Sequence, residues 1–448
     1  MTKWLDRPTL LVFVVALTMR LIVFAIHPYS HEPYDDSLQY DRIAWNIVQG
    51  NTFSLDTEPP YEPTARRPPG YPAFLSFWYL LFGQNYRLVK LIQCVLGALI
   101  PVFAYKIARR IFSDRVALFS GIAVGLWPPL ALFSDRLMSE TLFTLCLIVA
   151  VYAIYRLIEA PKWYWGGLAG TGVAIAALTR PEAQLLFPFL LAVPVVLGGY
   201  RRTRNALVIG AIAYAMLVVP WYVRNYVVFD RFIPLATGAE AVESRYEERE
   251  GKRQIYRPER QIYLDYLLGK GERAEANRKL RQNPSTEERE RVEQEMGEAS
   301  TNGAASGTLQ RLKVKALFLV VRVYQLWGPT SYSQTFGLSG DFVEYLKSGN
   351  YGAFVVKASL LGLNFAGVVV GWLGILLSLR AWRRCLPMLV VIGYFFGIYT
   401  LIHAIARYRI PIMPYMLVFS VYAGFRVFSY FRAKIAAKSE NMAEAVEG

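Results

Sequence analysis

The sequence predicts an all-α polytopic membrane protein of about ten transmembrane helices, with outer-face loops that carry short interfacial helices. Hydrophobic residues make up 54% of its 448 residues and charged residues only 19%. Soluble domains contain about 45–50% apolar residues and have roughly a quarter of their residues charged. Apolar stretches long enough to cross roughly 30 Å of hydrocarbon recur along the chain. The expected spans are 9–27, 88–107, 116–133, 139–157, 164–179, 183–199, 206–223, 353–379, 387–402 and 410–430.

The net charge of +15 lies in the apolar part of the chain, because acidic and basic residues nearly balance in the polar segment 240–310. Lysine and arginine in short loops mark the cytoplasmic side of a membrane protein. No basic stripe interleaved with aromatic residues occurs, so a membrane is the favoured partner and nucleic acid is not. The basic residues expected in the cytoplasm are Lys3, Arg7, Lys106, Arg109, Arg110, Arg115, Arg156, Lys162, Arg201, Arg202, Arg204, Arg380, Arg383, Arg384, Arg432, Lys434 and Lys438.

Two long segments, 28–87 and about 225–352, then face outward, and loops of this length usually carry function. The first apolar stretch continues past Arg20 without a small-x-small cleavage site, which predicts an uncleaved anchor in the inner (plasma) membrane. The predicted parts are an N-terminal transmembrane catalytic module 1–230 with the first outer loop 28–87, a large outer (periplasmic) loop 231–352, and C-terminal transmembrane helices with a short cytoplasmic tail, 353–448.

Short helices are expected within these outer segments. Pro33 and the acidic pair Asp35/Asp36 suit a helix N-terminus, and Gly50 suits its end. A second helix should follow the two prolines at 68–69 and run from Gly70 to Phe82. The stretch Leu312–Leu326 is interpreted as an interfacial amphipathic helix, since a span there would place the arginines at 380–384 outside.

Two carboxylates at this outer face are candidates for chemistry. Asp36 and Tyr40 are four residues apart and share one face of the predicted helix. Glu140 lies at the mouth of a span, where ionisable groups are costly and usually functional. Both acidic residues have a structural alternative as helix caps, Asp36 in the loop and Glu140 together with Ser139.

Arginines at the same face complement the carboxylates. Arg66 and Arg67 precede a proline-rich turn, and Arg407 and Arg409 lie at the outer end of the last span. Guanidinium groups bind phosphate oxygens through paired hydrogen bonds, although each pair alone is equally explained as a headgroup anchor. Together the two pairs indicate a pocket for a phosphate held at the membrane surface.

Cysteine and histidine are too sparse to indicate a disulfide framework or a metal centre. Cys94, Cys146 and Cys385 lie in or beside apolar runs and are interpreted as core residues. His27 and His31 lack further ligands at metal-binding spacing. No cofactor is therefore required, and a divalent ion between the acidic residues remains an alternative.

Six short motifs in order resemble the GT-C membrane glycosyltransferases that use polyprenyl-phosphate-linked sugars, the broad family of the protein O-mannosyltransferases and the lipid A aminoarabinose transferase. The resemblance runs from the first span to about Phe229 and resumes near Arg407. The matching pieces are Asp36-x-x-x-Tyr40, Arg67-Pro68-Pro69-Gly70-Tyr71-Pro72, Ser139-Glu140-Thr141-Leu142-Phe143, Leu178-Thr179-Arg180-Pro181-Glu182, Pro220-Trp221-Tyr222-Val223-Arg224-Asn225-Tyr226 and Arg407-Tyr408-Arg409-Ile410-Pro411.

The resemblance implies a GT-C bundle and a glycosyltransferase that takes a sugar from a polyprenyl phosphate at the outer face, with inversion. By position in the motifs, Asp36 is the implied catalytic carboxylate, Asp35 is a second candidate beside it, and Glu140 is the second acidic residue. The acceptor is a lipid, a glycan or a protein. The residues expected to bind the donor and its lipid phosphate are Arg66, Arg67, Tyr40, Tyr71, Arg224, Arg407 and Arg409.

Two other functions remain as alternatives. A flippase or transporter of an anionic lipid tends to carry ionisable groups at mid-membrane and repeated halves, and neither pattern occurs in the sequence. An O-antigen-type polymerase or ligase also works on polyprenyl carriers, but releases a diphosphate. The identity of the released lipid separates these functions.

Overall fold

The computed structural model describes residues 6–26, 33, 36–237, 319–328, 342–401 and 405–447, and every regular element among them is a helix. The chain divides into one compact unit of Met1–Gly238 with Leu326–Gly448 and a second of Ala239–Gln325. Only residues 319–325 of the second unit are described, and they are helical. Asp35, His27, His31, His403 and the whole segment 240–310 lie outside the described residues.

All ten expected spans fall on helices of the first unit. Six described helical runs are long and apolar enough to cross a membrane, or seven when one bent pair counts as a single span, so the chain is a multi-pass membrane protein. The helices on the expected spans are α1 (Arg7–Ile26), α4 (Tyr86–Ile111), α5 (Asp114–Gly125), α6 (Pro128–Ser134), α7 (Glu140–Glu159), α8 (Trp163–Thr179), α9 (Leu186–Gly198), α10 (Tyr200–Phe229), α17 (Tyr351–Ser378), α18 (Trp382–Leu401) and α19 (Met413–Glu447).

The expected span 116–133 is broken into α5 and α6, which meet at a bend of 51°. Pro128 and Pro129 follow Trp127, and proline disfavours helical backbone in the residue before it, so the break is local in origin. Arg20 of α1 stabilises the break, because its Nη1 donates to the carbonyl oxygen of Gly125 at the end of α5. Arg20 is fully buried and, among the described residues, has no carboxylate partner, so it does not reach the membrane surface.

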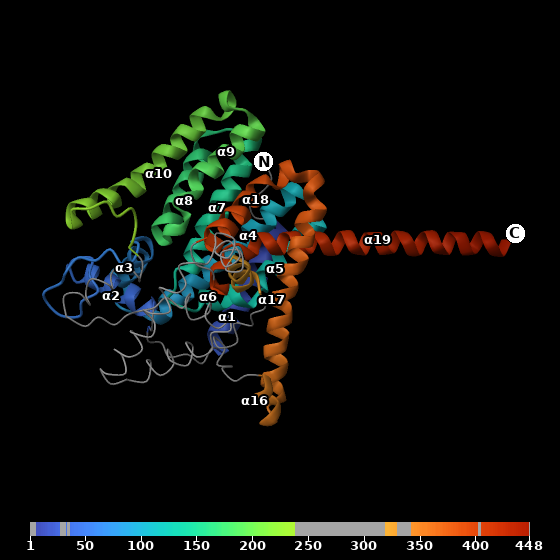
Figure 1. Ribbon diagram of the computed structural model, residues 1–448, viewed down its shortest axis with the longest axis horizontal. Helices are drawn as coiled ribbons and strands as arrows, with labels where there is room; N and C mark the ends of the chain where they lie inside the picture. The colour runs from blue at the N-terminus through green and yellow to red at the C-terminus, as the bar shows by residue number, and fades with distance from the viewer. Residues whose placement is uncertain are drawn as a thin grey trace, which may run out of the picture. The chain divides into compact units, whose positions relative to one another are not determined.

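Helices α8 and α10 approach one another more closely than any side chain at the contact would allow. A Cβ atom added to Gly166 or to Gly170 would overlap a backbone carbonyl of α10, at Ala206 and Gly210 respectively. The interpretation of Gly166-x-x-x-Gly170 as a helix-packing motif is therefore confirmed. Figure 1 shows α8, α9 and α10 in green beside one another.

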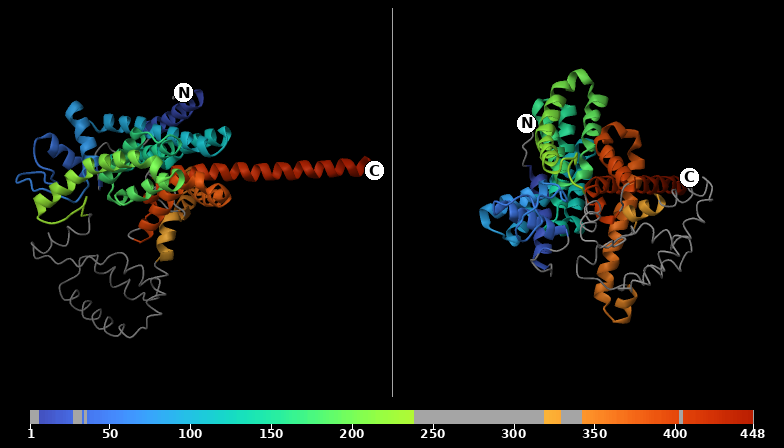
Figure 2. Two further views of the ribbon diagram at one scale, coloured as in Figure 1. Left: turned by 90° about the horizontal axis from the view of Figure 1, so that it is seen from above. Right: turned by 60° about the vertical axis from the view of Figure 1, so that its left-hand side comes forward.

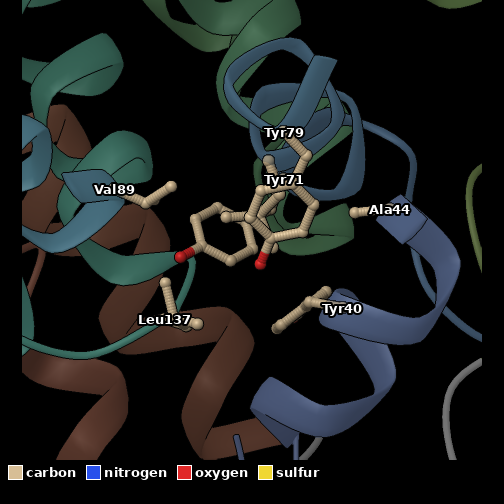
Figure 3. Close-up of a cluster of buried hydrophobic side chains, with 7 residues drawn as sticks. Tyr40, Ala44, Tyr71, Tyr79, Val89 and Leu137 are labelled. Carbon is tan, nitrogen blue, oxygen red and sulfur yellow. The ribbon is translucent and has the colours of Figure 1, made fainter. Parts of the chain in front are cut away.

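The segment 28–87, the predicted outer loop, carries both expected short helices, α2 (Asp36–Val48) and α3 (Gly70–Phe82). Tyr40 of α2 packs edge-on against Tyr71 of α3 at 5.0 Å between ring centroids, as Figure 3 shows. Tyr71 Oη donates to Gln93 Oε1 of α4 over 2.7 Å. These contacts bind the loop helices to the bundle and fix where α2 begins.

Asp41 provides a second anchor for α2. Its carboxylate accepts hydrogen bonds from Tyr79 Oη at 2.8 Å, from Gln84 Nε2 at 3.0 Å and from Tyr86 Oη at 3.1 Å. All three donors are neutral and belong to α3, α4 or the turn between them. The carboxylate is buried, so this set of donors holds α2 against the start of α4.

The last part of the first unit begins with the short helix α16 (Phe342–Lys347) and continues through the hairpin of α17 and α18. The one-turn helix η4 (Ala406–Arg409) then leads into α19, which is one unbroken helix in both views of Figure 2. Helices α17 and α19 pack closely, since a Cβ on Gly374 would overlap the backbone of Phe419. Arg407 of η4 contacts Glu140, the first residue of α7.

Candidate active site

Asp36, the first residue of α2, lies between two arginines that come from distant parts of the chain. Its Oδ1 accepts a hydrogen bond from Arg67 Nη2, and its Oδ2 accepts one from Arg407 Nη2 at 2.9 Å. Arg67 is further held by Gln39 Oε1 at 2.8 Å and lies over the ring of Tyr40. Asp36 is therefore not a solvated helix cap, because each of its carboxylate oxygens accepts a hydrogen bond from an arginine.

Arg407 connects this carboxylate to a second one. Its Nε donates to Glu140 Oε1, which also accepts a hydrogen bond from Arg180 Nη1 at 3.0 Å. Arg180 Nη2 continues to Glu182 Oε1 at 3.3 Å. The result is a row of six alternating charges, defined here as the charge row. Its members in order are Arg67, Asp36, Arg407, Glu140, Arg180 and Glu182.

The sequence explains why these groups converge. Glu140 is the first residue of α7 and is fully buried, so its carboxylate lies at the positive end of that helix. Arg180 follows the last residue of α8, and Pro181 turns the chain so that Glu182 returns toward it. Asp36, Glu140 and Arg180 therefore lie where a helix begins or ends, and Arg67 lies in the loop just before α3.

The surroundings set the protonation of the charge row. Burial alone raises the pKa of the Asp36 carboxyl, but the positive charges of Arg67 and Arg407 outweigh burial and hold this pKa below its ordinary value. Burial alone lowers the pKa of Arg407, and the neighbouring carboxylates of Glu140 and Asp36 reverse that effect and raise it. Asp36 and Arg407 are therefore both charged at neutral pH.

Tyr40 and Tyr71 lie beside the charge row and are not part of its ion pairs. The pKa of Tyr40 is raised, mainly because its hydroxyl is buried. Tyr71 is fully buried and bonds to Gln93. Arg67 lies over the ring of Tyr40, and Tyr71 packs against Tyr40, while their predicted part in donor binding stays a prediction.

Two predicted arginines, Arg409 and Arg224, bind backbone carbonyls away from the charge row. Arg409 is buried and donates to the carbonyl oxygens of Leu326 at 3.2 Å and Gly328 at 2.9 Å. Arg224 donates to the carbonyl oxygen of Thr64 at 3.0 Å and lies over three aromatic rings. The backbone N–H of Arg66 donates to Thr64 Oγ1. The structure thus brings together Asp36, Glu140, Arg67 and Arg407 from the predicted set and places Arg409 and Arg224 elsewhere, while the part of Arg66 in donor binding stays a prediction.

Two members of the charge row, Arg180 and Glu182, were not in the predicted site. The sequence signal was present, because Arg180-Pro181-Glu182 directly follows an apolar run that ends at the predicted outer face. The sequence does not show that Arg180 binds Glu140, because the two residues are 40 positions apart. Among the described residues, no group of three or more histidine, cysteine and acidic side chains is placed to hold a metal ion. The expectation that no metal is required stays a prediction.

With this geometry in hand, comparison with known proteins is informative. Residues 66–223 match the family described as dolichyl-phosphate-mannose-protein mannosyltransferase. That segment holds Arg67, Glu140, Arg180 and Glu182. No curated protein matches the chain.

Two solved structures have a similar fold. ArnT from Cupriavidus metallidurans bound to undecaprenyl phosphate aligns with a TM-score of 0.52 at 14% identity, covering 92% of this chain and 59% of that one. The archaeal oligosaccharyltransferase AglB from Archaeoglobus fulgidus, in complex with an inhibitory peptide and a dolichol-phosphate, aligns with a TM-score of 0.54 at 16% identity. This alignment covers 96% of the present chain and 52% of AglB, so the chain spans little more than half of either protein.

These likenesses confirm the predicted GT-C bundle. Residues 66–223 are similar in sequence to the family described as dolichyl-phosphate-mannose-protein mannosyltransferase, and the chain as a whole has a GT-C fold.

Proposed function

We propose that the chain is a glycosyltransferase that moves a sugar from a polyprenyl-phosphate-linked donor to an acceptor at the outer face of the membrane, with inversion at the anomeric carbon. One observation carries the proposal: the Asp36 carboxylate is held between Arg67 and Arg407. This arrangement offers a base and two phosphate-binding groups within one set of contacts. Support also comes from the family matched by residues 66–223, and from the lipid phosphates named with ArnT and AglB.

The two arginines would bind the lipid phosphate. Their side chains are 18% and 26% exposed, and Asp36 is 28% exposed, so the Asp36 end of the charge row is open to a ligand. When the bond between the anomeric carbon and the phosphate oxygen breaks, the leaving phosphate gains negative charge. Guanidinium groups already fixed at that position stabilise the developing charge, and no strong general acid is needed for such a leaving group.

Asp36 would accept the proton of the acceptor hydroxyl as that oxygen bonds to the anomeric carbon. Its pKa is low in the structure because both arginines face it. A phosphate that binds those arginines takes up part of their positive charge, so the pKa of Asp36 rises and the carboxylate becomes a better base. The charge row thus couples donor binding to proton transfer, and direct displacement leaves a polyprenyl monophosphate.

Glu140 would position Arg407 in this scheme. It is fully buried, and it holds Arg407 through Nε while Arg407 Nη2 faces Asp36. Arg180 binds the same Glu140 oxygen from the other side. Glu140 is therefore a fixed support behind the phosphate-binding group, and a contact between Glu140 and the phosphate itself would be repulsive.

The outer-face assignment is supported by the opposite ends of the same helices. Glu140 begins α7, whereas the last turn of α7 contacts the basic loops: Tyr155 Oη donates to the carbonyl oxygen of Arg384, and Arg110 pairs with Glu159 at 2.8 Å. Arg109 pairs with Asp6 just before α1 at 2.7 Å. The loops rich in basic residues thus gather at the end of the bundle away from the charge row, and the positive-inside rule makes that end cytoplasmic.

The test is to identify the lipid product by mass spectrometry. Membrane vesicles that hold the protein and native acceptors are supplied with a panel of polyprenyl-phosphate sugars. Release of polyprenyl monophosphate, dependent on the protein and on one sugar, would establish the donor. A diphosphate product would favour a polymerase or ligase, and no release from folded protein would overturn the transferase.

A further inference from the structure

Four polar atoms around Arg180 are buried without a hydrogen-bond partner among the described residues. They are Arg180 Nε, one carboxylate oxygen of each of Glu140 and Glu182, and the hydroxyl of Tyr399. Glu140, Glu182 and Tyr399 all act electrostatically on Arg180, which places them around one guanidinium group. Buried polar atoms nearly always have partners, so these four atoms around one guanidinium group are free to contact a bound molecule.

The chemistry of these atoms specifies the ligand. Two are carboxylate oxygens that only accept hydrogen bonds, one is a guanidinium N–H that only donates, and the tyrosine hydroxyl does both. A phosphate would be repelled by the carboxylates, and a metal ion would leave the guanidinium unsatisfied. Hydroxyl groups donate and accept at once, so a molecule with several hydroxyls satisfies the whole set.

The position of the cluster agrees with that chemistry. Arg407 bonds to Asp36 and to Glu140, so the phosphate-binding end of the charge row is one arginine away from the orphaned atoms. Arg180 also lies over the rings of Phe143 and Tyr408, at 5.7 and 5.1 Å to the centroids, which supplies apolar surface beside the polar atoms. An anomeric phosphate on Arg67 and Arg407 would have its sugar ring adjacent to this cluster.

We propose that Arg180, Glu182 and Tyr399, together with Glu140, form the subsite for the hydroxyl groups of the donor sugar. This inference rests on the proposed transferase function. It adds that the two ends of the charge row bind different parts of the donor. The Arg67 and Arg407 end binds the lipid phosphate, and the Arg180 and Glu182 end recognises a hydroxyl-rich, uncharged sugar.

Tyr399→Phe is the sharpest variant, because it removes only the orphaned hydroxyl from a side chain that is 2% exposed. A purely structural account predicts unchanged or higher stability and no effect on ligands, since an unsatisfied buried hydroxyl is lost. Tyr415→Phe is the matched control. The Tyr415 hydroxyl is also buried without a partner, but it lies near Tyr155 in the last turn of α7, away from Arg180.

Binding is measured for two lipids: the donor that releases monophosphate in the panel above, and sugar-free undecaprenyl phosphate. The subsite predicts that Tyr399→Phe weakens donor binding about threefold to tenfold, leaves undecaprenyl phosphate binding unchanged and does not lower the melting temperature. Tyr415→Phe should leave the binding of both lipids unchanged. Equal effects of Tyr399→Phe on both lipids, or none on either, would overturn the subsite.

Glu182→Gln provides an independent check, since it keeps the shape of the side chain and removes its charge. Donor binding should fall about tenfold or more, because a hydrogen bond to a charged acceptor is stronger than one to an amide, and undecaprenyl phosphate should bind as before. If the wild type consumes no polyprenyl-phosphate sugar at all, the proposed function fails and the subsite fails with it. If the wild type turns over and neither variant distinguishes the two lipids, the subsite alone is wrong.

Discussion

Arg407 and Asp36 are 371 positions apart in the chain, yet Arg407 Nη2 donates to Asp36 Oδ2 over 2.9 Å. The contact joins the start of α2 to η4, the turn before α19. Arg407 also reaches Glu140 at the start of α7. One arginine thus connects three distant parts of the sequence, and the consequences of replacing it are specific.

Arg407→Lys should lower turnover by about ten- to a hundredfold. The guanidinium engages Asp36 through Nη2 and Glu140 through Nε, whereas a lysine ammonium is a single point that reaches only one of them. Arg426→Lys makes the same change on an exposed arginine of α19 and should leave turnover unaltered. Steady-state rates for both variants, normalised to folded protein, check this; equal rates for Arg407→Lys and wild type would remove Arg407 from the mechanism.

The stability contributed by Asp36 should depend on pH in one direction. Its pKa in the folded protein is below the ordinary value because Arg67 and Arg407 outweigh burial. A carboxyl with a depressed folded pKa stabilises the protein fully at pH values above its unfolded pKa of about 3.9, and this contribution is lost as the pH falls through the folded pKa. The difference in melting temperature between wild type and Asp36→Asn should therefore be constant from pH 7 to about 5 and shrink below about 4. A difference that grows on acidification would contradict the ion pairs.

Asp41→Asn should act on stability rather than on catalysis. The Asp41 carboxylate accepts from Tyr79, Gln84 and Tyr86, and an amide nitrogen in place of one oxygen would face donors instead of an acceptor. The expected loss is about 1–3 kcal/mol, with turnover per folded molecule largely retained. Thermal unfolding and rates measured on the same preparations separate the two effects. A large loss of turnover without destabilisation would give Asp41 a part in the chemistry.

Gly166→Ala should destabilise the protein strongly, while Gly167→Ala should be nearly neutral. A Cβ at position 166 would overlap the backbone of Ala206, whereas one at 167 would meet the Ile209 side chain at 3.5 Å, an ordinary contact. The two positions are neighbours on one helix, so helix propensity is matched. Melting temperatures in detergent test the difference, and similar values for the two variants would contradict the close packing of α8 on α10.

Much of the fold could be predicted because its signals are local. Proline and glycine positions located α3 at Gly70–Phe82 correctly, and hydropathy located each of the ten expected helices. The break between α5 and α6 was missed, although Pro128 and Pro129 mark it, because the apolar stretch runs through them. Hydropathy averages composition over a window of residues, so it does not detect a local break in the helical backbone.

The candidate site was predictable only in part, because its contacts are long-range. Asp36, Glu140, Arg67 and Arg407 were singled out and lie together in the charge row. Arg409 and Arg180 show the limit, since in the sequence both lie at ends of apolar runs on the predicted outer face. Arg409 turns toward backbone carbonyls while Arg180 turns toward carboxylates, and that choice depends on partners 81 and 40 positions away.

The partners of Arg224 could not be predicted from the sequence either. Its guanidinium is held by the Thr64 carbonyl and by aromatic rings, so in this structure it fastens the loop that leads into Arg66 and Arg67. Its predicted contact with the lipid phosphate is untested. An effect of Arg224 on donor binding through the position of that loop would need no contact with the phosphate.

The most direct test of the account is to compare wild type with Asp36→Asn in one preparation, measuring donor affinity and the single-turnover rate of polyprenyl monophosphate release. Asp36 as the base, with the arginines as the phosphate site, predicts a rate lower by about 10²–10⁴-fold and a donor affinity that is nearly unchanged or tighter. A donor affinity that collapses together with the rate would assign Asp36 to donor binding, and an unchanged rate would remove it from catalysis.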